Sequence, residues 1–303
     1  MFPSLLKRRV EERLMPELPE VETIRRQLKP KIVGKTIIGV KIFCNKSFQG
    51  DPKKIIGRKV LALNRVGKQL VIDLSGNLVI LVHFKMTGGF FFQPNKYTRV
   101  ALYLSSPFIK QRKSTRHPAG SSSPDKKEGF EGFFFSDPRK FGWLKVLTKR
   151  SWLSYQKNLG MDILSFSFTP EYFYQQLQTS SRPIKQVLLD QTKMAGAGNI
   201  YANEALFLAK IHPLTSSRDI PRDQAYSLNH YLKWVIMDSI SHNGSTARDR
   251  GYLQPNGQSG SHQNYFHVYQ KEGEKCSTCS AKIKRLKIGG RSTFYCSKCQ
   301  KIK

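Results

Sequence analysis

Four cysteines near the end of the chain constrain its fold more than any other feature of the sequence. Cys276 and Cys279 form one C-x2-C pair, and Cys296 and Cys299 form a second, with sixteen residues between the pairs. Two such pairs on turns, brought together by a hairpin, can hold four thiolates in the tetrahedral arrangement that zinc prefers. Two disulfides or a redox C-x2-C motif fit a basic chain of cytosolic type less well. The spacing therefore predicts one structural Zn²⁺ ion with a closed set of ligands.

The charge of the chain points to a polyanionic partner. Its 303 residues carry 51 Lys and Arg against 21 Asp and Glu, which gives a formal net charge of +30. Such a field attracts DNA, RNA or an anionic membrane surface. No apolar run approaches the roughly 20 residues that span a bilayer, and residues 1–14 lack the apolar core of a secretory signal. The charge alone does not choose among these partners, and the usage of the five cysteines fits a reducing, cytosolic compartment best.

The hydrophobic pattern changes along the chain and indicates several parts. Residues 17–29 carry apolar side chains at helical spacing, and acidic residues in the first turn suit the helix dipole. Several β-rich runs follow, separated by Gly, Asn, Ser and Pro, and indicate a sandwich or barrel with one helix leaning on it. From about residue 150 the pattern becomes helical, and the cysteine tail reads as a separate small unit.

Three stretches together resemble one family. They are PELPEVE at residues 16–22, AGAGNIYANEALFLAKIHP at 195–213, and the four-cysteine tail that contains GGRSTFYCSKCQK at 289–301. In this order and spacing the chain resembles formamidopyrimidine-DNA glycosylase, the bacterial base-excision enzyme for oxidised purines. The similarity runs from Met15 to the last residues. Because the three motifs have unrelated chemistry, their joint occurrence by chance is improbable.

The resemblance implies a multi-domain α+β fold. Its parts are an N-terminal β-sandwich with a leading helix, a helical helix–two-turn–helix domain, and a C-terminal zinc finger hairpin. We expect DNA in the cleft between the domains. The expected boundaries are 15–148 for the catalytic sandwich, with an inserted loop at 105–131, then 149–265 for the helix–two-turn–helix domain and 266–303 for the zinc finger. Residues 1–14 are expected to be a non-native or processed extension.

The resemblance also implies the nucleophile, which in this family is the amine of an N-terminal proline. Pro16 matches it if the mature chain begins after Met15. An internal proline nitrogen is a tertiary amide without a free lone pair, whereas a terminal proline is a secondary amine. Glu17 matches the family's general acid and base beside that amine. Offsetting the helix dipole is the ordinary role for a first-turn acid such as Glu17 or Glu20.

Three further residues match positions that the family places near the lesion. Lys68 corresponds to a strand lysine of the catalytic pocket, although a lone strand lysine is ordinarily solvated. Arg291 corresponds to an arginine of the zinc hairpin that grips phosphates and assists the final elimination, a role that suits its planar fork. Asn199 corresponds to a phosphate contact at a helix start, where Gly196 and Gly198 permit close approach and N–H groups favour an anion.

Flipping a nucleotide out of DNA leaves a void in the base stack, and the family fills that void with a trio of side chains. Met86, Arg139 and Phe141 match the trio: Arg139 would pair with the orphaned base, and the two apolar side chains would wedge into the duplex. Core packing is the common alternative for such residues. Two secondary phosphate contacts differ from the family, since Tyr97 stands where a histidine is usual and Ser181 where a lysine is usual.

These matches predict a DNA glycosylase and abasic-site lyase that removes 8-oxoguanine and formamidopyrimidines through a proline Schiff base. The expected partner is double-stranded DNA with oxidised bases, the expected location is the cytoplasmic nucleoid, and a monomer is expected. One alternative is an endonuclease VIII-like enzyme for oxidised pyrimidines. Another is a non-catalytic DNA-binding protein whose Pro16 stays capped by residues 1–14. A zinc-ribbon RNA-binding protein would explain the charge and the cysteines alone.

Overall fold

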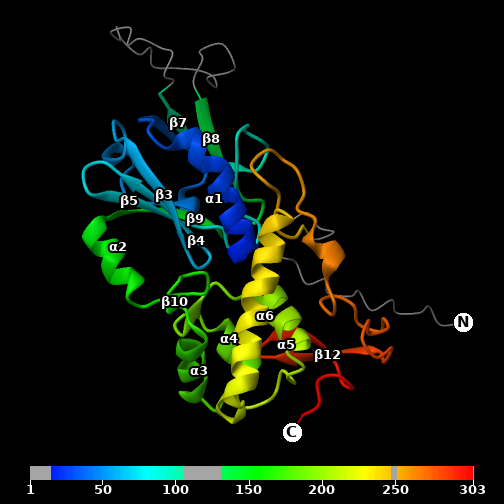
Figure 1. Cartoon of the computed structure of the whole chain (residues 1–303). Helices are drawn as coiled ribbons and strands as arrows, with labels where there is room; N and C mark the ends of the chain where they lie inside the picture. The colour runs from blue at the N-terminus through cyan, green and yellow to red at the C-terminus, as the bar shows by residue number, and fades with distance from the viewer. Residues whose placement is uncertain (1–14, 106–130, 247–250, 303) are drawn as a thin grey trace, which may run out of the picture.

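The computed structural model describes residues 15–105, 131–246 and 251–302. The expected extension at 1–14 and nearly all of the expected loop at 105–131 lie outside these residues. Two stacked sheets with a leading helix, a group of helices and a C-terminal hairpin make up the described part (Figure 1). The predicted fold class is therefore confirmed, whereas the domain boundaries stay predictions.

The N-terminal domain is a sandwich of two sheets. The strand order is β1-β7-β8-β6 in one sheet and β2-β9-β5-β4-β3 in the other. Apolar side chains from the inner faces form a common core, in which the rings of Phe84, Phe90 and Phe135 pack together. The strands are β1 Ile37–Ile42, β2 Phe48–Gln49, β3 Val60–Val66, β4 Gln69–Leu74, β5 Leu78–His83, β6 Gly89–Phe91, β7 Thr98–Leu104, β8 Glu131–Ser136 and β9 Trp143–Thr148, with short 3-10 helices η1 Asn45–Ser47 and η2 Pro52–Lys54.

The predicted leading helix is confirmed as α1, Leu18–Ile32. At its N-terminus the backbone N–H of Glu17 donates a hydrogen bond to Glu20 Oε2 at 2.9 Å, which forms one half of a capping box. Val21, Ile24 and Leu28 recur at helical spacing and are fully buried against the sandwich. The helix therefore lies between strands β3 and β4 on one side and helix α6 on the other (Figure 1).

Five further helices of the described part follow the sandwich. The side-chain oxygens of Thr148 and Thr169 cap two of them by accepting backbone N–H groups. None of the described helices has the length and apolar character needed to cross a bilayer. The elements are α2 Lys149–Gln156, α3 Pro170–Gln178, α4 Ile184–Leu189, α5 Asn199–Leu208 and α6 Arg222–Ser241, with 3-10 helices η3 Ser217–Asp219 and η4 His262–Tyr265 and the paired short strands β10 Met161–Asp162 and β11 Met194–Ala195.

A two-stranded hairpin ends the described chain. Strands β12, Ile283–Ile288, and β13, Arg291–Cys296, are antiparallel and are joined by Gly289 and Gly290. Both glycines are left-handed, with φ of 56° and 78°, which a two-residue turn of the primed type requires and which glycine adopts without a steric cost. This turn places Arg291 at the first position of β13.

The hairpin is part of the helical domain's core. Phe294 and Cys296 from the hairpin pack in the same buried cluster as Ile200 and Phe207 of α5. Leu18, the first residue of α1, belongs to this cluster as well, although the rest of α1 packs on the sandwich. The first turn of α1 therefore lies where the sandwich, the helices and the hairpin meet.

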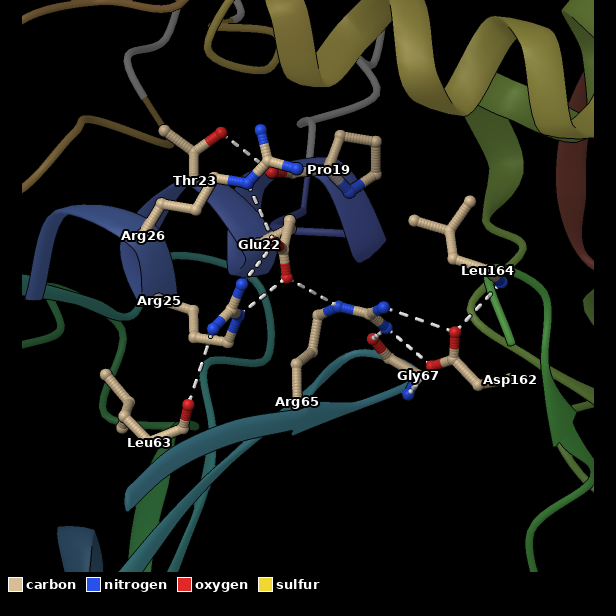
Figure 2. Close-up of polar contacts among 10 residues, drawn as sticks. All are labelled: Pro19, Glu22, Thr23, Arg25, Arg26, Leu63, Arg65, Gly67, Asp162 and Leu164. Atoms are coloured by element: carbon tan, nitrogen blue, oxygen red, sulfur yellow. Dashed lines mark hydrogen bonds and ion pairs between the residues drawn. The ribbon is translucent and has the colours of Figure 1, made fainter. Parts of the chain in front are cut away.

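A chain of ion pairs crosses the junction between the sandwich and the helical domain. Arg65, on β3, lies between Glu22 of α1, at 3.2 Å, and Asp162 of β10, at 2.6 Å. Arg25 and Arg26 also bind Glu22, at 2.7 and 2.9 Å, so one carboxylate faces three guanidinium groups (Figure 2). The side chains of Arg65 and Glu22 are each only 8% exposed, so this pairing is shielded from solvent.

The Glu22 cluster predicts an acid-dependent loss of stability. Burial alone would raise the pKa of Glu22, but the hydrogen bonds and charges of its arginines outweigh burial and hold the pKa at about 2. A carboxyl with a lowered folded-state pKa stabilises the fold above its unfolded pKa, near 4.5, and that contribution is lost as the pH falls toward 2. We expect the free energy of unfolding, measured by urea denaturation, to decrease across this interval.

Glu22→Gln serves as the comparison for this measurement. It should lower stability at neutral pH, because three guanidinium groups lose their carboxylate partner. It should also make the free energy of unfolding less dependent on pH between pH 4.5 and 2. An unchanged slope in Glu22→Gln would show that other carboxyl groups govern acid unfolding.

Candidate active site

The carboxylate of Glu17 lies at the meeting point of the three parts of the molecule. Glu17 directly follows Pro16, and both residues are buried. One carboxylate oxygen, Oε1, accepts the backbone N–H of Asn199 at 2.6 Å. The other oxygen, Oε2, is buried and has no hydrogen-bond partner among the described residues. One oxygen of the carboxylate is therefore held by the start of α5, and the other is left without a hydrogen bond among the described residues.

The N–H group that holds Glu17 belongs to the start of a helix. Asn199 is the first residue of α5, where the backbone dipoles favour a negative charge. From the sequence we predict that an anion, namely a DNA phosphate, binds at this helix start. In the structure, that N–H group is occupied by a carboxylate of the chain itself.

Burial shifts the pKa values of Glu17 and Lys68 toward each other, while the charges around them act against the shift. Burial raises the pKa of Glu17, while the charge of Lys68, the N–H of Asn199 and the charge of Arg291 oppose the shift. Burial likewise lowers the pKa of Lys68, against the attraction of the Glu17 carboxylate. Burial thus draws both groups toward their neutral forms, which suits groups that accept and donate protons. The structure therefore brings together Pro16, Glu17, Lys68 and Arg291, the expected catalytic residues.

The turn that carries Lys68 is held by the helical domain. Gly67 and Lys68 are the two residues between β3 and β4, and Gly67 has φ of 57°. The N–H of Gly67 donates to Asp162 Oδ2 at 2.7 Å, and its carbonyl accepts Arg65 Nη1 at 2.9 Å (Figure 2). A Cβ at Gly67 would lie 3.0 Å from Cβ of Ala195, the last residue of β11. Asp162 and Arg65, which sequence patterns did not indicate, thus position Lys68.

The approach of Glu17 to α5 depends on Gly198. A Cβ at Gly198 would lie 1.7 Å from Cδ of Glu17, a distance that no non-bonded pair can adopt. The backbone of Gly198, with φ of −122° and ψ of −175°, is extended and accessible to any residue. Gly198 is therefore required for the space it leaves and not for its conformation.

Gly198→Ala should displace the Glu17 carboxylate while leaving the fold intact. We expect base excision to fall by roughly 10²-fold, the effect of misplacing a reacting group by about 1 Å. Single-turnover cleavage of a lesion-containing duplex measures the rate, and circular dichroism checks the fold. Gly39→Ala is the matched control, since its Cβ would meet only an ordinary contact, 3.5 Å from Tyr103. Equal activity in both variants would contradict the proposed position of the carboxylate.

A second carboxylate, that of Glu20, lies directly behind the first. Its Oε2 accepts the N–H of Glu17 at 2.9 Å, and its Oε1 accepts the hydroxyl of Tyr201 at 2.6 Å and the N–H of Ser245 at 2.8 Å. Burial and the nearby Glu17 charge raise the pKa of Glu20 to about 7, although the Tyr201 bond acts against them. Glu20 thus connects the first turn of α1 to α5 and to the segment after α6, which is more than dipole compensation.

The four predicted metal ligands converge in the hairpin unit. The Sγ atoms of Cys276, Cys279, Cys296 and Cys299 all lie within 4.8 Å of one another, and none of these cysteines is in a disulfide. Ligands at the usual Zn–S distance of about 2.3 Å in a tetrahedron are separated by about 3.8 Å. In the structure the Sγ atoms of Cys279 and Cys296 lie 3.4 Å apart, and those of Cys276 and Cys299 lie 3.8 Å apart. The cluster is therefore suited to one zinc ion, as predicted.

Two asparagines on α5 anchor the hairpin next to Glu17. Asn199 Nδ2 donates to the carbonyl of Ser292 at 3.1 Å, and Asn203 Oδ1 accepts the N–H of Phe294 at 2.9 Å. They are one helical turn apart and bind β13 along the edge that β12 leaves open. Arg291, exposed at the start of β13, is thereby set beside the Glu17 pocket. The i, i+4 spacing of the asparagines was the only signal of this role in the sequence.

Loss of zinc should loosen Arg291 as well as the cysteine unit. We expect Cys296→Ser to lower zinc content, and to weaken duplex binding roughly tenfold through the lost charged contact. Zinc is measured by elemental analysis and binding by gel shift. Cys44→Ser is the control, because Cys44 is a free cysteine outside the cluster. Zinc-free protein with unaltered duplex affinity would contradict a role for the hairpin in binding.

The predicted void-filling residues lie on two turns of the sandwich. Phe141 is 51% exposed and is not part of the core, and the guanidinium carbon of Arg139 lies 4.9 Å from its ring centre. Met86 is half-buried in the turn after β5. Tyr97 is 39% exposed on a neighbouring loop. Exposure favours contact with a ligand over core packing, and their roles on DNA stay predictions.

Ser181 lies exposed before α4, and its predicted phosphate contact stays untested.

Lys185, four positions after Ser181, is fully buried, which is rare for lysine without a partner. Lys185 Nζ donates to the carbonyl of Asn199 at 3.4 Å. Sequence reasoning missed Lys185, because a lysine in an apolar stretch does not reveal which carbonyl it reaches.

Family models match this chain in three successive segments. Residues 15–144 match the formamidopyrimidine-DNA glycosylase N-terminal domain, and residues 159–250 match the H2TH domain of the same glycosylase. Residues 273–302 match the zinc finger found in FPG and IleRS. A sandwich, an H2TH domain and a zinc finger in this order define a class of DNA glycosylases.

Comparison with individual proteins identifies the family. The formamidopyrimidine-DNA glycosylase of Zymomonas mobilis is 38% identical over 295 residues, covering 95% of this chain and 100% of the relative. The crystal structure of the MutM (Fpg) protein from Thermus thermophilus is 35% identical, with a TM-score of 0.81 over 95% of this chain and 100% of that one. A Lactococcus lactis Fpg mutant in complex with Fapy-dG-containing DNA is 29% identical, with a TM-score of 0.80 over 94% of this chain and 100% of that one. The chain belongs to the formamidopyrimidine-DNA glycosylase family.

Proposed function

We propose that this chain is a bifunctional DNA glycosylase and abasic-site lyase that removes oxidised purines from duplex DNA in base excision repair. The observation that carries the proposal is the Glu17 carboxylate, buried directly after Pro16 and held at 2.6 Å by the first N–H of α5. The relatives named as formamidopyrimidine-DNA glycosylases support the substrate class. The charges of Lys68 and Arg291 near Glu17 support a site for a DNA strand.

The nucleophile requires a chain that begins at Pro16. With Met15 attached, the Pro16 nitrogen is a tertiary amide and cannot attack. Once Met15 is removed, it becomes a secondary amine, and an α-amino group titrates near about 8, so a usable fraction is unprotonated at neutral pH. The match of the family's N-terminal domain from residue 15 supports this start.

The reaction then follows from the amine and the carboxyl. The Pro16 nitrogen forms a bond to the sugar C1′, and the bond from C1′ to the damaged base breaks, with its electron pair leaving on the base. The proline nitrogen then loses its proton, and the bond from C1′ to the ring oxygen O4′ breaks with its electron pair going to O4′, which takes a proton from Glu17. The ring is now open, and the iminium between C1′ and the proline nitrogen acidifies the hydrogens on C2′. Loss of a C2′ proton expels the 3′ phosphate, and a second elimination expels the 5′ phosphate. Glu17 moves protons at the sugar, through the oxygen that has no other partner among the described residues.

The other residues hold the DNA. Lys68 would contact the lesion and its phosphate, and Arg291 would grip the flanking phosphates and assist the second elimination. Met86, Arg139 and Phe141 would fill the void left by the flipped nucleotide. Asn199 would contact a phosphate at the start of α5, and Tyr97 and Ser181 would be secondary phosphate contacts. The zinc ion has a structural role, since all four of its positions are taken by cysteines.

Oxidised pyrimidines are the second substrate class to test. A wild-type Lactococcus lactis Fpg has been solved with an oxidized pyrimidine containing DNA, and it is 29% identical to this chain. Rates on duplexes with 8-oxoguanine and with thymine glycol distinguish the two assignments. We expect the 8-oxoguanine duplex to be cleaved faster than the thymine glycol duplex. We also expect the active species to be a monomer, and light scattering measures its mass.

Removal of residues 1–15 should switch on covalent chemistry. We expect protein expressed from Met15, and shown by intact mass to begin at Pro16, to form a borohydride-trapped adduct with an 8-oxoguanine duplex. Protein that retains residues 1–15 should bind the duplex and form no adduct, because its Pro16 nitrogen is acylated. Absence of an adduct from the trimmed protein would falsify the lyase assignment and favour a non-catalytic DNA-binding protein.

Glu17→Gln in the trimmed protein tests the proton-transfer role. Base excision should fall by roughly 10²-fold to 10⁴-fold, the usual contribution of a general acid and base, while duplex affinity survives. Glu171→Gln is the matched control, because Glu171 is an acid in the first turn of another helix, α3, where its carboxylate accepts the hydroxyl of Tyr226. Full activity of Glu17→Gln would remove Glu17 from the mechanism.

A further inference from the structure

One buried carboxylate, that of Asp137, gathers the turns that carry the proposed void-filling residues. Asp137 follows β8 and is 0% exposed. Its Oδ2 accepts the N–H groups of Phe141 and Gly142, both at 2.7 Å. Its Oδ1 accepts the N–H of Arg139 at 3.1 Å and the hydroxyl of Thr87. Four donors from two separate turns therefore converge on one side chain.

The second turn is the one that carries Met86, the neighbour of Thr87. It is closed by the N–H of Gly88 donating to the carbonyl of Phe84 at 2.9 Å. The two turns also pack directly, since a Cβ at Gly142 would lie 2.9 Å from that same carbonyl oxygen. The Thr87 hydroxyl bond to Asp137 therefore joins two turns that already touch.

The backbone of Asp137 extends the connection to a third loop. Its N–H donates to the carbonyl of Tyr97 at 3.0 Å, and its carbonyl accepts Arg99 Nε at 2.9 Å. An aspartate that closes its own turn needs only the N–H groups that follow it. The bonds to Thr87 and Tyr97 come from segments far along the chain, and closing a local turn does not require them.

We propose that Asp137 is a positioning residue that fixes Met86, Arg139 and Phe141 in one arrangement, so that they enter the duplex together. This inference rests on the proposed function. A nucleotide leaves the stack only if the void is filled at the same time, and separate mobile side chains would each lose conformational entropy on insertion. Turns ordered beforehand by a shared buried acceptor avoid much of that loss. The Arg139 cation over the Phe141 ring is part of this ordered unit.

Three variants of the trimmed enzyme test the inference. Asp137→Ala removes all four bonds to the carboxylate, and Asp137→Asn keeps one oxygen. Thr87→Val removes the two bonds of the Thr87 hydroxyl, which donates to Asp137 Oδ1 and accepts the N–H of Arg139 at 3.4 Å. On a duplex with 8-oxoguanine we expect Asp137→Ala to lower single-turnover excision by roughly 10²-fold, with Asp137→Asn and Thr87→Val in between. The dependence of the rate on the base opposite the lesion should also weaken, because Arg139 would no longer be held in place.

A single-stranded abasic oligonucleotide provides the discriminating measurement. It has no opposite base and no stack to fill, so borohydride trapping on it should change by less than about twofold in these variants. Asp73→Asn is the matched control, since Asp73 is another sandwich carboxylate and binds Asn64 and Lys149 on β4's outer side. It should leave both reactions unchanged.

Each outcome separates this inference from the proposed function. Equal losses on the duplex and the single strand would show a general folding role for Asp137 and overturn the inference. Full duplex activity in Asp137→Ala would overturn it as well. If Asp137→Ala does not fold, the same two measurements on Thr87→Val decide the question, because valine has nearly the same shape as threonine. Failure of the unmutated trimmed enzyme to trap either substrate would instead overturn the proposed function.

Discussion

One hydrogen bond holds the proposed active site together, from the N–H of Asn199 to the carboxylate of Glu17, 182 positions earlier in the chain. It joins the start of α1 to the start of α5, where the helix dipole favours the negative charge. The same α5 binds the hairpin through Asn203, so one helix fixes both the proton-transfer group and the strand that begins with Arg291. The cysteine cluster is connected to the site through α5, because the hairpin that ends at Cys296 binds this helix. Gly198 has no side chain, and Glu17 lies in the space that a side chain would occupy.

Three glutamates of one short motif acquire three different properties from their surroundings. Glu17 faces the start of α5, Glu20 faces Tyr201, and Glu22 faces a group of arginines. Burial raises the pKa of Glu17 and brings that of Glu20 to about 7, whereas the arginines hold that of Glu22 at about 2. Residue type alone therefore does not assign a role, because burial and partners decide which carboxyl can carry a proton at neutral pH.

Local patterns in the sequence were sufficient for the elements and for the metal ligands. Helix α1 follows from apolar spacing and the cysteine cluster from its C-x2-C pairs, and both are found. The residues that position the site were not predictable in this way. Asp162 binds Gly67 and Asn203 binds Phe294, partners 95 and 91 positions away, and no local period records such contacts. Asp137 was part of a motif noticed for its neighbours, Arg139 and Phe141, while its own side chain is the acceptor that unites them.

The bond between Asp162 and Gly67 couples the relative orientation of the two domains to the geometry of the pocket. Asp162 belongs to the helical domain, and Gly67 directly precedes Lys68 on the sandwich. A shift of Asp162 relative to the sandwich would therefore act directly on the turn that carries the Lys68 amine, and through it on the separation of that amine from the Glu17 carboxylate.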